Sequence, residues 1–136
     1  MKKFIGNYAP EIFAILRIIA GLMFMLHGAQ KLFGYPGDGQ TVEIASMMGI
    51  AGIIEFFGGL LIALGLFGSI AAFIASGQMA AAFFIAHFPQ GWNPLVNKGE
   101  LAVLYCFLFL YIAARGAGIW SVDSIMNKNQ ARNIKD

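Results

Sequence analysis

The sequence predicts an all-α protein embedded in a membrane as a four-helix bundle, and two observations support this. Hydrophobic residues make up 59% of the 136 residues, charged residues make up only 12%, and thirteen residues are Phe. This composition is far more apolar than that of a soluble domain of the same length. The apolar segments are also too long and too continuous for transmembrane β-strands, which need about ten residues of alternating polarity.

Four apolar segments account for the predicted helices. They are expected at residues 11–33, 46–67, 70–88 and 99–115. Pro10 suits the first turn of the first helix, and the glycine-rich stretch 34–39 ends that helix. A very short connection at 68–69 and a loop with two prolines at 89–94 separate the later helices. Short connections favour antiparallel neighbours.

The chain beyond the fourth helix is less apolar. Residues 116–126 include Trp120, a residue type that is enriched at membrane interfaces, so this segment is expected to lie along the membrane surface. We therefore expect a single domain over 1–126, followed by a polar, mobile cytoplasmic tail over 127–136.

The distribution of basic residues predicts the orientation. One side of the membrane receives Lys2, Lys3, Arg115, Lys128, Arg132 and Lys135, and the other receives Lys31 and Lys98 beside several acids. Because Lys and Arg concentrate in cytoplasmic segments, both termini are expected inside the cell. The predicted protein is a multi-pass protein of the inner, cytoplasmic membrane with an N-in/C-in topology.

Several polar side chains occur inside the apolar helices. Arg17, His27, Glu55 and Gln78 all fall in the middle of the predicted bundle, where they would form a polar pocket. A charged group near the centre of a bilayer costs about 2.5–3.5 kcal/mol on insertion scales, so these groups need partners on other helices. We expect Glu55 to pair with Arg17, and we consider His27 and Glu55 as candidates for proton handling.

A second polar group is expected near the outer boundary. Lys31, His87 and Glu100 would form the outer mouth of the same track. Structural roles are open alternatives: Arg17 can snorkel to the interface, and His27 can be a hydrogen-bonded core residue. The histidine spacing does not match a metal site, and no pattern for nucleic-acid binding is present.

Five motifs occur in the order typical of one known family. They are Arg17 to Gly34 with Gly21, His27-Gly28 and Lys31-Leu32-Phe33-Gly34, the run EFFGGLLIALGL at 55–66, an Ala-rich helix ending in His87, NKGE at 97–100 and GAGIWSVD at 116–123. Nearly the whole chain therefore resembles the DoxX family of small bacterial and archaeal membrane proteins. The resemblance implies four membrane helices and a link to redox chemistry, because relatives include a quinone-linked subunit of an archaeal thiosulfate oxidation system.

Two classes of function follow from these observations. The first is a membrane oxidoreductase component that binds a quinone in the polar pocket and receives electrons from a separate partner, since the single Cys106 provides no dithiol. The second is an accessory subunit that docks onto other membrane proteins or onto further copies of itself. A carrier for a small solute is a weaker third hypothesis, because four helices are few for a carrier.

Overall fold

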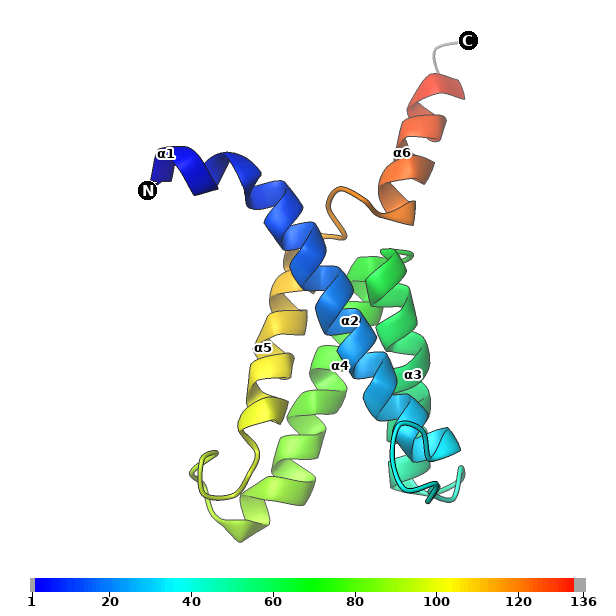
Figure 1. Cartoon of the computed structure of the whole chain (residues 1–136), viewed down its shortest axis with the longest axis vertical. Helices are drawn as coiled ribbons and strands as arrows, with labels where there is room; N and C mark the ends of the chain where they lie inside the picture. The colour runs from blue at the N-terminus through cyan, green and yellow to red at the C-terminus, as the bar shows by residue number, and fades with distance from the viewer. Residues whose placement is uncertain (1, 134–136) are drawn as a thin grey trace.

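The computed structural model describes residues 2–133, and every regular element in this range is helical (Figure 1). A short lead of α1 (Lys2–Ile5) and a 3-10 turn (Gly6–Tyr8) continues into α2. The main helices are α2 (Ala9–Phe33), α3 (Met47–Leu64), α4 (Gly68–Ala82) and α5 (Glu100–Arg115), and α6 (Val122–Asn133) follows them.

The four main helices form two hairpins. Helix α2 packs along α3 in the first hairpin, α4 packs along α5 in the second, and α3 and α4 join the two hairpins. Figure 1 shows the lead segment and α6 at one end of the bundle, which we call the terminal end. The long connections lie at the opposite end, the loop end, where the two hairpins diverge.

Glycines set the register between α2 and α3. A Cβ atom at Gly21 would lie 2.6 Å from the backbone nitrogen of Ala63, and one at Gly28 would overlap the backbone of Phe56. The two helices therefore approach at backbone distance, as small residues allow in membrane bundles. On this register Glu55 lies level with His27, and Arg17 lies level with Gly65 near the terminal end.

The core between the hairpins is aromatic and aliphatic. Phe24 of α2 and Phe109 of α5 are almost completely buried, and their ring centroids are 4.7 Å apart in an edge-on arrangement. Ile62 and Ile112 are also fully buried, and the alanines of α4 fill the narrow space beside them. This packing joins the two hairpins over their middle and leaves the loop end free to diverge.

The helix boundaries agree with those expected to within three residues, except after α4. That helix continues through a π-helical turn, Phe83–His87, and a 3-10 turn, Phe88–Gln90. Single π turns are rare and often occur at functional sites.

The C-terminal segment differs from expectation. Helix α5 ends at Arg115, as expected, and the chain is irregular until Ser121. Helix α6 then runs from Val122 to Asn133 across the boundary expected at 126, and the last part of the expected tail, 134–136, lies outside the described residues.

The terminal end is held together by long-range hydrogen bonds. The buried guanidinium of Arg17 donates hydrogen bonds to the carbonyls of Ile62 and Ala63, at 2.7 and 2.6 Å, and to the carbonyl of Trp120 at 2.7 Å. The carboxylate of Asp123 accepts from the backbone N–H groups of Phe67 and Gly68, both at 2.9 Å, and so caps α4. Both ends of the α3–α4 turn are therefore tied to the segment after α5.

Three stretches of helix are long and apolar enough to cross a membrane. They are Gly6–Phe33, Met47–Leu64 and Gly68–Gln90. Large hydrophobic side chains such as Phe73, Phe84 and Phe107 are exposed on the outside of the bundle, as lipid-facing residues are. Helix α5 has 16 residues, and we propose below that it makes a fourth crossing.

Candidate functional site: a polar cavity at the loop end

A cavity of about 300 Å³ lies between the two hairpins on the loop-end side of Phe24. All four main helices and the turn after α4 contribute to it. Its walls are mostly apolar, and its polar lining residues are His27, Lys31, Glu55, Gln78, His87, Lys98 and Tyr105. Small-molecule sites have this composition, with apolar walls and a few convergent polar groups.

The centre of the polar group is an ion pair between α2 and α3. The ammonium nitrogen Nζ of Lys31 lies 2.5 Å from both carboxylate oxygens of Glu55. The side chain of Glu55 is 2% exposed and that of Lys31 is 23% exposed, so the carboxylate is buried while the lysine side chain is still partly accessible. A buried carboxylate is stable in its charged form only with such a partner.

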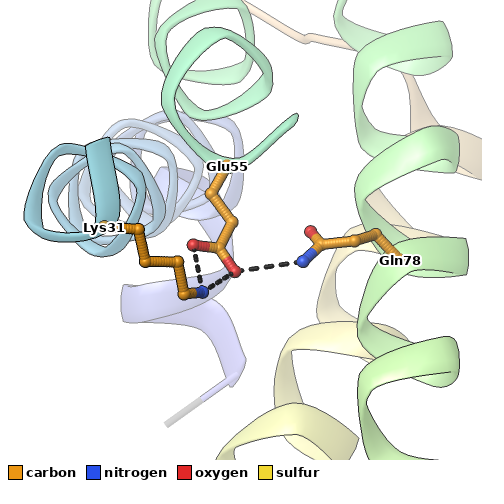
Figure 2. Close-up of polar contacts among 3 residues, drawn as sticks. All are labelled: Lys31, Glu55 and Gln78. Carbon is orange, nitrogen blue, oxygen red and sulfur yellow. Dashed lines mark hydrogen bonds and ion pairs between the residues drawn. The ribbon is translucent and has the colours of Figure 1, made fainter. Parts of the chain in front are cut away.

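Gln78 of α4 completes the contacts of this carboxylate (Figure 2). Its amide nitrogen Nε2 donates a hydrogen bond of 3.0 Å to Oε1 of Glu55, while its own Oε1 is buried without a partner among the described residues. No other side-chain hydrogen bond connects the helices of the first hairpin with those of the second in the described chain. Gln78 therefore holds the two hairpins together beside the cavity and orients the carboxylate.

The expected pairing of Glu55 with Arg17 is wrong. Both residues point into the bundle, but on the register that Gly21 and Gly28 define they are separated by about ten residues of α2, roughly 15 Å along the axis at 1.5 Å per residue. Arg17 instead caps the end of α3 and does not line the cavity. Lys31, expected at the outer mouth, reaches inward along its flexible side chain to Glu55.

The two histidines lie at different parts of the cavity wall. His27 is exposed, makes no hydrogen bond with the described residues, and lies edge-on to Tyr105 with centroids 6.4 Å apart. His87 is half-buried, and its Nδ1 lies 3.0 Å from the carbonyl oxygen of Asn97. Because a carbonyl only accepts, Nδ1 is the donor in this contact.

Of the residues predicted from the sequence, the structure brings His27, Lys31, Glu55, Gln78 and His87 together around this cavity. Glu100 does not line it, and its side chain is exposed in the first turn of α5. Among the described residues, no group of three or more His, Cys, Asp and Glu side chains is arranged to hold a metal ion.

Three contributors were missed as site residues. Lys98 and Tyr105 line the cavity, and the buried Asn97 shapes its loop by donating to the carbonyl of Gly91 at 2.6 Å and accepting from the N–H of Gly99 at 2.8 Å. Tyr105 lies on the buried stripe of α5 together with Ala102, Phe109 and Ile112. The sequence pattern of this stripe does not distinguish Tyr105 from a residue that only packs in the core.

The fold and the cavity define a small multi-pass membrane protein with a paired acid and base inside its bundle. The chain belongs to the DoxX family, whose model matches residues 12–88, from the first turn of α2 to the residue after the π turn. That match includes the whole Lys31–Glu55–Gln78 group and excludes α5.

Two relatives agree with this assignment. A protein of Haemophilus influenzae, described as an uncharacterized protein, is 42% identical over 126 residues, which cover 87% of this chain and 92% of the relative. A protein of Escherichia coli K12, described as inner membrane protein YqjF, is 32% identical over 123 residues and covers 84% of this chain and 91% of the relative. No solved structure matches the chain. The protein is a multi-pass protein of the inner membrane.

Proposed function

We propose that the protein is a membrane oxidoreductase component that binds a quinone in the loop-end cavity and works with a separate electron-donor partner. The observation that carries the proposal is the Lys31–Glu55–Gln78 group, a charged and hydrogen-bonded set of side chains beside a largely apolar cavity inside a membrane bundle. Ionisable residues in such positions are expensive and commonly mark pathways for ligands or protons.

The residues present suit a quinone headgroup. Ligand pockets range from about 300 to 1,000 Å³, so the cavity accepts a flat ring but not a long tail as well. Quinone carbonyls need hydrogen-bond donors, and the lining offers the ammonium of Lys31, the imidazole of His27 and the second N–H of the Gln78 amide. Exposed lining residues such as Met48 and Leu101 border the opening through which an apolar tail would reach the lipid.

A bound quinone would supply reversible two-electron, two-proton chemistry at its carbonyl oxygens. The contribution of the protein is to hold the ring and to manage the protons. Among the described residues that line the cavity, Glu55 is the only acid, so its carboxylate oxygens are the site at which a proton is taken up or released. Lys31 keeps the charge of that carboxylate compensated, and Gln78 fixes its orientation.

We further propose a four-crossing topology with the terminal end in the cytoplasm. Arg115, Lys128 and Arg132 lie in α5 and α6 at that end, whereas Lys31 and Lys98 belong to the cavity at the other. By the positive-inside rule the cavity then faces the outer half of the membrane.

The test is to purify the protein in mild detergent, extract bound isoprenoid quinone and identify it. The wild type is expected to carry quinone, and Glu55→Gln and His27→Ala are expected to lose most of it. Cys106→Ser is the matched control, because Cys106 packs against Ser76 between α4 and α5 and does not line the cavity. Absence of quinone from every preparation, together with migration in a larger complex, would favour the accessory-subunit function instead.

A further inference from the structure

Tyr105 is a polar residue of the cavity for which the described residues supply no hydrogen-bond partner. The residue is 6% exposed, yet its hydroxyl bonds to none of the described residues, and it is not among the polar atoms that are sealed from solvent without a partner. Since Tyr105 lines the cavity, the accessible part of the hydroxyl is the part that borders it. A buried tyrosine normally satisfies its hydroxyl, so a free one beside a cavity points to a ligand.

The ring of Tyr105 is held rigidly. It stacks on Phe109 with centroids 5.2 Å apart, packs against Phe24 at 5.7 Å and meets the edge of His27 at 6.4 Å. These three contacts leave the ring little freedom to reorient. The hydroxyl is therefore preorganised, and a ligand that bonds to it does not have to immobilise a flexible side chain.

Tyr105 lies at a depth similar to that of the Lys31–Glu55 pair, but on the other hairpin. It contacts His27, which is level with Glu55 on the register of α2 and α3, so the hydroxyl and the Lys31–Glu55 pair lie at similar depth. The pair belongs to the first hairpin and Tyr105 to the second. A ligand ring with polar atoms on two opposite sides could therefore form hydrogen bonds with both hairpins at once.

Building on the proposed function, we infer that the Tyr105 hydroxyl donates a hydrogen bond to a carbonyl oxygen of the bound ring and is a specificity-determining residue of the site. It selects rings with an oxygen substituent over plain aromatic rings of the same size. The Lys31–Glu55–Gln78 group holds the other side of the ligand.

The experiment compares two probes of almost equal shape, 2-methyl-1,4-naphthoquinone and 2-methylnaphthalene, by equilibrium dialysis against the purified protein in detergent. The second probe has no carbonyl, so it reports hydrophobic partitioning alone. Tyr105→Phe should bind the quinone about 3- to 10-fold more weakly, the effect of one neutral hydrogen bond, and should bind the hydrocarbon like the wild type. Its thermal midpoint should not fall, because the lost hydroxyl has no hydrogen-bond partner in the part of the chain that the structure describes.

Tyr111→Phe is the matched control on the same helix. Its hydroxyl accepts from Arg115 at 2.9 Å, outside the cavity, so this variant should bind both probes like the wild type. Unchanged quinone affinity in Tyr105→Phe, with affinity lost in Glu55→Gln, would overturn the role of Tyr105 and leave the proposed function standing. A wild-type protein that does not distinguish the quinone from the hydrocarbon would overturn both.

Discussion

Arg17→Leu should lower the free energy of unfolding by about 3 kcal/mol or more, because it removes charge-assisted hydrogen bonds and leaves the buried carbonyl of Ala63 without this donor, whereas the carbonyl of Ile62 keeps the N–H of Gly65. The guanidinium joins the end of α3 to Trp120, so one substitution loosens both the α3–α4 turn and the segment after α5. Arg17→Lys should recover only part of the loss, since a single ammonium cannot match a planar group that donates in two directions. Unfolding by SDS titration in mixed micelles measures these changes.

The control for this substitution is Arg115→Leu. Arg115 is exposed, and its guanidinium carbon lies 4.2 Å from the ring centroid of Phe13, a contact that contributes about 0.5–1 kcal/mol at exposed sites. If Arg17→Leu were no more destabilising than Arg115→Leu, the hydrogen bonds of Arg17 would not stabilise the terminal end as the geometry indicates.

Lys31→Met should destabilise the protein by about 3–5 kcal/mol, because it leaves the buried carboxylate of Glu55 without its charged partner. The double variant Lys31→Met/Glu55→Leu should recover much of that loss, since no uncompensated charge is left inside the bundle. The same SDS titration applied to both single variants and the double variant gives the coupling energy.

The corresponding cycle with Arg17 is the control. Arg17→Leu and Glu55→Leu should be additive, because the two side chains have no common partner and lie at different depths. Strong coupling between Arg17 and Glu55, with none between Lys31 and Glu55, would contradict the observed ion pair.

The sequence was informative about which side chains turn inward. At about 100° per residue, the spacing of Arg17, Lys31, Gly21 and Gly28 places all four on one face of a helix, and in the structure that face packs on α3. The depth of each polar side chain in the membrane was harder to predict, because it depends on the register of α2 against α3. That register is set by the contacts of Gly21 and Gly28 with the backbone of α3, and not by the expected helix ends. The error of pairing Glu55 with Arg17 in place of Lys31 follows from that difference.

Other parts of the site depend on contacts between distant segments. Asp123 caps α4 more than fifty positions earlier in the chain, and no local pattern indicates that partner. Tyr105 was not predicted as a site residue, because a tyrosine in an apolar stripe is typical of a packing residue. Only the structure shows that it lines the cavity. The π turn Phe83–His87 lies where the sequence predicts a continuous helix to residue 88.

The most direct test of the central claim, that the loop-end cavity binds a quinone ring, is photoaffinity labelling with an azido-quinone in native membranes, followed by peptide mapping. We expect the label on cavity-lining residues of both hairpins, such as Met48 and Met79, with loss of label when unmodified quinone is added in excess. Label confined to lipid-facing residues such as Phe73 and Phe107, and insensitive to that competitor, would contradict it.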